Sequence, residues 1–406
     1  MLFFCRFSAI YFGLYCLPYA LSLIPGANYL QGLYWESTTH AARWAAKSFF
    51  GVSTFIDGPN GSGDTVVEYV RALILLAIAF IVASITSFIS EQTWEDTAFT
   101  AVQLMIRLSL GGLLIGYGLA KIIPPGQFPH PSIANLAVPL GESSPMGLLW
   151  TFMGSSRAYC NITGGLEVLA GIMLFIPRLS LLGALLSIAI MANVFFLNMC
   201  YDVPVKLFSG HLLILSAFLV LPGARQLFNF FVLQVPTTFK GPAELFEQGR
   251  WNQVALGIQV LLLAFTLYST IRRDLKFGEQ FRQRVAEIKL LGIWSITPSH
   301  LSDSSSWARL AFDHKSRMYA FSNDGQMQRF QAKYDYEKMT IELKGMDDLK
   351  IEKNFSFSLN QNQTEVVLEE SANATGEKIK LTKQPDPQYL LNNRGFRWIN
   401  EMPFNR

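Results

Sequence analysis

Four ionisable residues lie in or beside long apolar runs, and their types could support charge pairing or proton transfer. Glu167 lies inside the apolar run 162–176, Arg107 and Lys121 bracket a second run, and His211 opens a third. A charged side chain near mid-bilayer costs about 2.5–3.5 kcal/mol, so it needs a partner or a function. We therefore predict one intramembrane polar site that contains Arg107, Lys121, Glu167 and His211.

Each of these residues also has a simpler interpretation. Arg107 and Lys121 are separated by about 21 Å along a helix, so their side chains could extend to opposite membrane surfaces. The sharper hypothesis makes Lys121 the counter-ion of Glu167. His211 could relay a proton or hydrogen-bond a quinone-like carbonyl, although a histidine at a helix end is as often structural.

Polar residues near these runs are expected to support the site. Asn193 and Asn198 lie in one apolar segment, where their amides could hydrogen-bond between helices. Asp202 and Lys206 flank Pro204 in the densest polar patch beside the apolar runs.

The composition is that of a membrane protein. Half of the 406 residues are hydrophobic and 16% are charged, whereas a soluble domain has about 25% charged residues. The net charge of +3 includes no basic tract, so we expect a lipid bilayer and no nucleic acid as a partner. No metal-ligand spacing, dinucleotide fingerprint, nucleophile–base pair or thiol pair is present in the sequence, which argues against an enzyme acting on its own.

Apolar length predicts seven membrane-spanning segments, since about 20 residues cross a bilayer. They are residues 7–24, 71–90, 101–123, 160–176, 179–200, 204–221 and 252–271. The first could be a secretory signal, but we favour a retained helix because no small-x-small cleavage site follows it.

The polar links carry shorter features. We expect a surface helix at 38–50, a plain turn rather than a phosphate loop at 57–64, and an interfacial helix at 224–233. The proline-rich link 124–158 contains an apolar stretch, 147–153, that could return to the membrane surface.

From residue 290 onward, short alternating runs predict an antiparallel β domain that closes into a sandwich or barrel. The runs are 290–297, 307–312, 317–321, 326–334, 338–343, 354–359, 364–368, 378–381 and 389–398. Gly292 and Trp294 are similar to the G-x-W signature of lipocalin-like barrels, which implies that Trp294 closes one end under Arg394 or Arg397. We favour a filled interior over a ligand cavity.

The membrane segments resemble DoxX-like membrane proteins. Residues 107–121 (RLSLGG…YGLAK) are similar to the first helix of that family, GGLEVLAGIML around Glu167 to the second, and the His211 helix to the fourth. Residues 141–154, 198–206 and 394–406 resemble a longer bacterial subgroup with a C-terminal β domain. The resemblance implies a four-helix core and, in some relatives, a role as a small subunit of quinone-linked oxidoreductases.

The predicted organisation has four parts: N-terminal helices and a long link at 1–100, a DoxX-like core at 101–222, an interfacial helix and last span at 223–276, and a soluble β domain at 277–406. The first hypothesis for function is a membrane subunit associated with quinone-linked redox chemistry or proton relay, in a bacterial inner membrane. The alternatives are a transporter or lipid-handling protein whose β domain binds an apolar cargo, and a structural membrane anchor. The family pattern and the basic patch at 272–284 disagree on the side of the β domain.

Overall fold

The computed structural model describes two compact units of the chain. They comprise Met1–Gln127 with Ala158–Lys276, and Phe128–Arg157 with Phe277–Arg406. The described residues are 2–56, 61–89, 95–239, 241, 246, 248–297, 307–313, 316–346, 349–370, 378–385, 387, 389–394 and 401. The boundary near 277 agrees with the sequence analysis. The link 128–157, by contrast, belongs to the second unit rather than to a 101–222 core.

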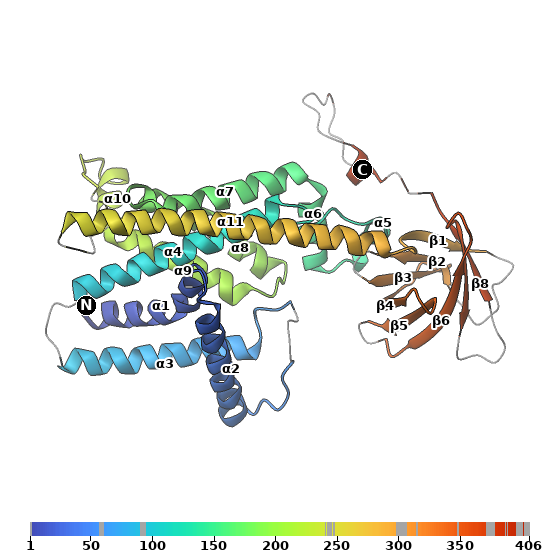
Figure 1. Cartoon of the computed structure of the whole chain (residues 1–406), viewed down its shortest axis with the longest axis horizontal. Helices are drawn as coiled ribbons and strands as arrows, with labels where there is room; N and C mark the ends of the chain where they lie inside the picture. Colours follow the sequence, from blue (N-terminus) through green and yellow to red (C-terminus); the bar gives the residue numbers. More distant parts are fainter. Residues whose placement is uncertain are drawn as a thin grey trace. The chain divides into compact units, whose positions relative to one another are not determined.

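The first unit is a bundle of membrane-type helices (Figure 1). Seven helical stretches of the described chain are long and apolar enough to cross a membrane, which confirms the predicted class of polytopic helical membrane protein. The helices are α1 (Leu2–Ser22), α2 (Asn28–Phe50), α3 (Val66–Ile89), α4 (Glu95–Ile122), α7 (Arg157–Phe175), α8 (Ser180–Cys200), α9 (Lys206–Val220), α10 (Ala224–Phe231) and α11 (Gly249–Glu287).

Helix α10 has nearly the bounds of the helix predicted at 224–233. It follows α9 through one 3-10 turn, Leu221–Gly223, and the sixth membrane-type stretch runs from Lys206 to Phe231. The 15 residues of α9 reach only about 22 Å, less than the roughly 30 Å of a bilayer core.

Helix α2 lies crosswise to its neighbours α1 and α3 (Figure 1). It begins at Asn28, ten residues before the surface helix predicted at 38–50, and ends at Phe50 as predicted. Ala42, Ala45 and Ala46 pack against Val70 of α3. Trp44 on the opposite face is exposed, as is typical of aromatic residues at a membrane–water interface.

Four glycines bring α4 and α7 into backbone contact. A Cβ on Gly118 would lie 2.5 Å from the carbonyl oxygen of Gly164, and a Cβ on Gly171 would lie 2.7 Å from that of Gly111. Any larger residue would separate the helices, so these glycines permit the close approach. The contact also sets the C-terminal turn of α4 against the middle of α7.

The second unit contains a closed antiparallel barrel in the simple order β1 to β8, with β8 pairing back to β1. The strands are β1 (Gly292–Ile296), β2 (Trp307–Phe312), β3 (Arg317–Ser322), β4 (Met327–Asp335), β5 (Thr340–Gly345), β6 (Glu352–Leu359), β7 (Glu365–Glu370) and β8 (Lys378–Lys383). This closed eight-stranded up-and-down architecture confirms the predicted class of β domain. The ninth predicted run is not a strand: Leu390–Asn393 forms the short helix α12, and 395–398 lie outside the described residues.

Large side chains fill the barrel interior. Each strand contributes at least two inward residues at alternate positions to one buried core, for example Phe330 and Ala332 from β4 and Phe355 and Phe357 from β6. This alternation is what the period-2 pattern of the sequence predicts. This packing supports the interpretation of a filled core. It does not support the hypothesis that the barrel holds an apolar cargo.

Trp294 occupies the position that the G-x-W resemblance implied, but its cationic neighbour differs. Its ring is fully buried, and its Nε1–H donates to the carbonyl of Leu290 at 2.7 Å. Lys383, not Arg394, lies over the ring, with Nζ 5.7 Å from its centroid. Lys383 takes this place because β8 pairs with β1 and sets Lys383 opposite Trp294. Arg394 follows α12, and Arg397 lies outside the described residues.

The proline-rich link packs on the outside of the barrel. It contains α5 (Ile133–Leu136), a 3-10 turn (Leu140–Glu142) and α6 (Pro145–Ser155). Ala134 joins a buried cluster on strands β1 to β3, and the Tyr319 hydroxyl donates to Asn135 Oδ1 at 2.9 Å. An even number of membrane-type stretches separates this link from the barrel, so both emerge on the same side of a bilayer.

Candidate functional site

Lys121 and Glu167 form a buried ion pair inside the helical bundle. Lys121 Nζ donates to Glu167 Oε1, and the two residues are 7% and 3% exposed. The glycine contact between α4 and α7 permits this approach, because Gly164 leaves room beside the Lys121 side chain. Lys121 is thus the counter-ion of Glu167 rather than a side chain extended to the membrane surface. Glu167 Oε2 has no hydrogen-bond partner in the described part of the chain.

Arg107 has a different partner, which the sequence analysis missed. Its Nη2–H donates to Oε1 of Gln259 on α11, and both residues are buried. Among the described residues, no hydrogen bond or ion pair connects Arg107 with Glu167. The only sequence signal for Gln259 was its own polarity within an apolar run, and nothing there pointed to Arg107.

His211 lies in an aromatic cluster with α1. Its Nδ1 is 2.7 Å from the carbonyl oxygen of Leu207, which can only accept, so Nδ1 carries the proton. In the neutral ring, Nε2 then accepts from the Tyr11 hydroxyl at 2.6 Å. Tyr15 stacks on the imidazole with centroids 4.2 Å apart. Both ring nitrogens are occupied, so this geometry supports a positioning role more than direct contact with a ligand.

The single four-residue site therefore resolves into three groups: Lys121 with Glu167, Arg107 with Gln259, and His211 with Tyr11 and Tyr15. Sequence spacing places residues on helix faces, but it does not determine which faces of nonadjacent helices meet.

The polar residues predicted to support the site differ in burial and in their partners. Asn198 is buried and donates from Nδ2 to Ser209 Oγ at 3.0 Å, so it links α8 to α9 as predicted. Asn193 is exposed on the outer face of α8, and the prediction that it joins helices within this chain is wrong. Lys206 pairs with Asp202 at 2.8 Å.

Asp64, at the end of the predicted turn cluster, caps a helix distant in sequence. Its two carboxylate oxygens accept from the backbone N–H groups of Lys206 and Leu207, each at 2.9 Å. A carboxylate at a helix N-terminus accepts hydrogen bonds from backbone N–H groups that have no partner within the helix. Its negative charge also interacts favourably with the positive end of the helix dipole. Residues 57–60 of the cluster lie outside the described residues.

Replacing Asp64 with alanine is expected to destabilise the bundle by about 1–2 kcal/mol, because two helix donors lose their acceptor. Unfolding in mixed micelles would measure the loss. Asp64→Asn is the matched control and should lose less, since its amide oxygen still accepts. Equal losses in both variants would contradict the capping role.

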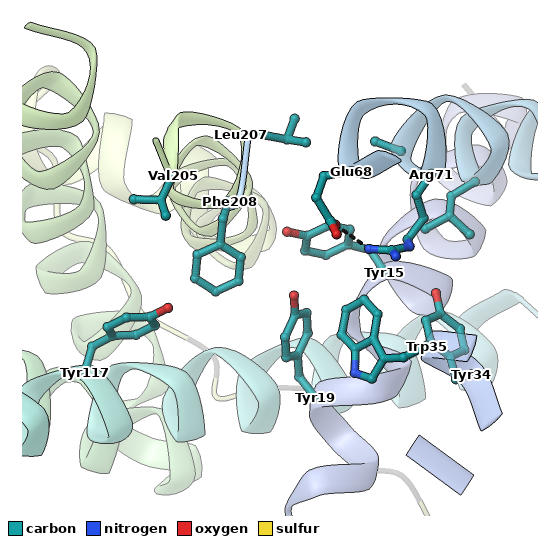
Figure 2. Close-up of a pocket in the computed structure, with 13 residues that line it drawn as sticks. Tyr15, Tyr19, Tyr34, Trp35, Glu68, Arg71, Tyr117, Val205, Leu207 and Phe208 are labelled. Carbon is teal, nitrogen blue, oxygen red and sulfur yellow. Dashed lines mark hydrogen bonds and ion pairs between the residues drawn. The ribbon is translucent and has the colours of Figure 1, made fainter. Parts of the chain in front are cut away.

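Next to these groups, one end of the bundle contains a pocket of about 210 Å³. Figure 2 shows its wall, which combines residues from α1, α2, α3, α4 and α9. Six of the lining side chains are aromatic: Tyr15, Tyr19, Tyr34, Trp35, Tyr117 and Phe208.

The aromatic rings form a connected row along the pocket. Phe208 lies 5.9 Å from both Tyr117 and Tyr19, and Tyr19 lies 5.9 Å from Trp35 (Figure 2). The Arg71 guanidinium lies over Trp35 at 4.9 Å, which adds a cation–π contact at the end of the row. The pocket thus presents flat apolar faces together with phenol hydroxyls.

The two charged residues at the edge of the pocket, Glu68 and Arg71, neutralise each other. Arg71 pairs with Glu68 and donates to Thr39 Oγ1 at 2.7 Å. Tyr34, on α2 outside the spanning segments, donates to the carbonyl of Leu14 at 2.8 Å, and burial raises the pKa of its hydroxyl. The edge therefore favours a neutral, polar ligand group over an ion.

The pocket adjoins two of the predicted groups. Tyr15 lines the pocket and stacks on His211, and Tyr117 precedes Lys121 by one turn of α4. The pocket residues carry no distinctive sequence signal, because tyrosine and tryptophan are common throughout membrane-interface segments. The available signals were Tyr15 and Tyr19 on one helix face and the Glu68/Arg71 pair at the start of an apolar run.

Together, the bundle and the barrel define an integral membrane protein of helical spans with a C-terminal β-barrel domain. The uncharacterized protein YwoB of Bacillus subtilis (strain 168) is 32% identical over 131 residues, which is 32% of this chain and 82% of that protein. The chain therefore belongs to the same family as YwoB. No family model and no solved structure matches the chain, so membership of the DoxX-like family stays a prediction.

Proposed function

We propose that this protein binds a lipid-soluble molecule with a flat, hydrogen-bonding headgroup of the quinone class and acts as a non-catalytic membrane partner of a redox enzyme. The aromatic pocket at the end of the bundle is the observation that supports this proposal. Ligand sites combine mainly apolar or aromatic walls with a few polar groups that orient the ligand. The proposal includes DoxX-like membership, which rests on the resemblance of residues 107–121 and of the segment around Glu167. It also includes a bacterial inner membrane, for which the bacterial relative is the supporting observation.

The chemistry of the wall fits such a headgroup. A quinone ring is planar and can stack on the row formed by Phe208, Tyr19 and Trp35. Its two carbonyls only accept hydrogen bonds, and the phenol hydroxyls of Tyr19 and Tyr117 can donate to them. The isoprenoid tail can remain in the apolar phase beside the helices.

In this proposal, His211 and the Lys121–Glu167 pair position residues of the pocket wall. His211 holds the Tyr15 ring in place by stacking and is itself held by Tyr11. Lys121–Glu167 stabilises the α4–α7 contact that carries Tyr117. We assign no electron or proton transfer step to this chain alone.

Fluorescence quenching by a short-chain quinone tests the proposal. Trp35 lines the pocket, whereas Trp44 on the same helix is 65% exposed and not part of its wall. We expect saturable quenching of the purified protein in mild detergent, most of it lost in Trp35→Phe and retained in the matched control Trp44→Phe. Equal quenching in both variants would contradict binding in this pocket.

Mass spectrometry of molecules that copurify with the protein separates the remaining functions. A bound quinone supports the proposal. A phospholipid that a quinone does not displace would favour lipid handling, and an empty, non-binding protein would favour a structural anchor. Because the barrel interior is filled, the cargo hypothesis has no supporting observation in the β domain.

A further inference from the structure

The amide of Asn193 lies on the outer face of a membrane-spanning helix. Asn193 is exposed and has no hydrogen-bond partner in the part of the chain that the structure describes. It precedes Cys200, the last residue of α8, by two helical turns, about 10 Å. Asparagine is too short to reach the headgroups over that distance, unlike lysine or arginine. Its amide therefore faces hydrocarbon, which offers it no hydrogen bond.

The neighbours of Asn193 form a narrow outward stripe on α8. Leu182, Ala189 and Phe196 are exposed on the same face, because they are separated from one another by two helical turns. The opposite face, with Gly183, Ala184, Ser187 and Met191, is buried, and α8 packs there mainly on α9. Ala189, one turn before Asn193, lets another helix approach the amide closely.

We propose that a second copy of this chain covers the stripe and that the two Asn193 amides hydrogen-bond reciprocally across a twofold axis parallel to the membrane normal. An amide carries both a donor and an acceptor, so it is complementary to its own symmetry mate. Amide hydrogen bonds between membrane helices are an established source of association. The dimer gives each amide the partner that neither lipid nor the described part of its own chain supplies.

Cysteine cross-linking tests the dimer in membranes. Cys200 is an exposed free thiol on the same stripe, whereas Cys16 and Cys160 are buried, so a Cys5→Ser background leaves Cys200 as the accessible thiol. A short bis-maleimide is expected to produce a cross-linked dimer in this background. Adding Asn193→Leu should reduce the yield of that product, and adding Asn193→Gln should retain it because glutamine restores the amide.

A dilution series in detergent, followed by energy transfer between labelled copies, measures the same equilibrium. Asn193→Leu is expected to weaken the dimer about three- to thirtyfold. Ile214→Leu, at an exposed position of α9, is the matched control and should leave it unchanged. Because Asn193→Leu replaces a polar group by an apolar one in lipid, its circular dichroism and melting should match the wild type, so a loss of dimer is not a loss of fold. A monomeric wild type, or an unchanged dimer in Asn193→Leu, would overturn the proposal.

Discussion

Replacing Glu167 with leucine is expected to destabilise the helical bundle by about 3–5 kcal/mol. The carboxylate is 3% exposed and compensates the charge of Lys121, which is itself 7% exposed. Its removal leaves a buried ammonium without a counter-ion between α4 and α7. The glycine contacts hold these helices close together, so Lys121 has little freedom to find another partner. Unfolding in mixed micelles, followed by circular dichroism, measures the effect.

The double variant Lys121→Met/Glu167→Leu separates the charge effect from packing. A buried ion pair replaced by apolar residues of similar size is often nearly neutral in stability, so the double variant should recover most of the loss. Glu167→Gln should fall between the wild type and Glu167→Leu, because its amide oxygen can still accept from Lys121. A double variant as unstable as Glu167→Leu would show that the pair does not stabilise the bundle through charge compensation.

Replacing Trp294 with alanine is expected to destabilise the barrel by about 3–5 kcal/mol. The indole is fully buried in the core that closes one end of the barrel, and it donates to the carbonyl of Leu290. Truncation leaves a cavity and an unsatisfied carbonyl, and both raise the free energy of the folded state. The rate of proteolysis of the full-length protein in increasing urea, read at cleavage sites within the barrel, would report the loss.

Trp251→Ala is the control for that measurement, since Trp251 lies on α11 and is 50% exposed. A surface substitution of this kind usually changes stability by less than about 0.5 kcal/mol. Trp294→Phe keeps most of the buried area and should lose less than Trp294→Ala. If Trp294→Ala resists proteolysis as well as the control does, the indole does not hold the barrel closed.

The large elements of the fold could be predicted from local patterns. Each membrane span needs about 20 apolar residues, so the runs around Glu167 and His211 were recognisable without any contact information. The barrel strands alternate inward and outward, and this period-2 pattern predicted eight of them, including the strand of Trp294. Within the run predicted as a ninth strand, 390–393 form a helix instead, because a short alternating run also fits a brief helix.

The candidate site depended on contacts between distant residues. Gln259 meets Arg107 across 152 positions of the chain, and Tyr11 meets His211 across 200. Asn193 and Asn198 have the same chemistry in one helix, but only Asn198 faces the bundle. No local pattern distinguishes them, because the burial of each side of α8 depends on where α9 packs.

The sequence by itself determined that this chain crosses a membrane and carries an antiparallel β domain, since apolar length and alternation act within single segments. It also showed that Glu167 required a partner, because hydrocarbon cannot solvate a carboxylate. Only the tertiary structure decided that this partner is Lys121, that Arg107 and His211 lie in separate groups, and that aromatic residues of four helices line one pocket. Those choices depend on which helix faces meet, and helix packing sets them through the glycine contacts of α4 and α7 and the capping of α9 by Asp64.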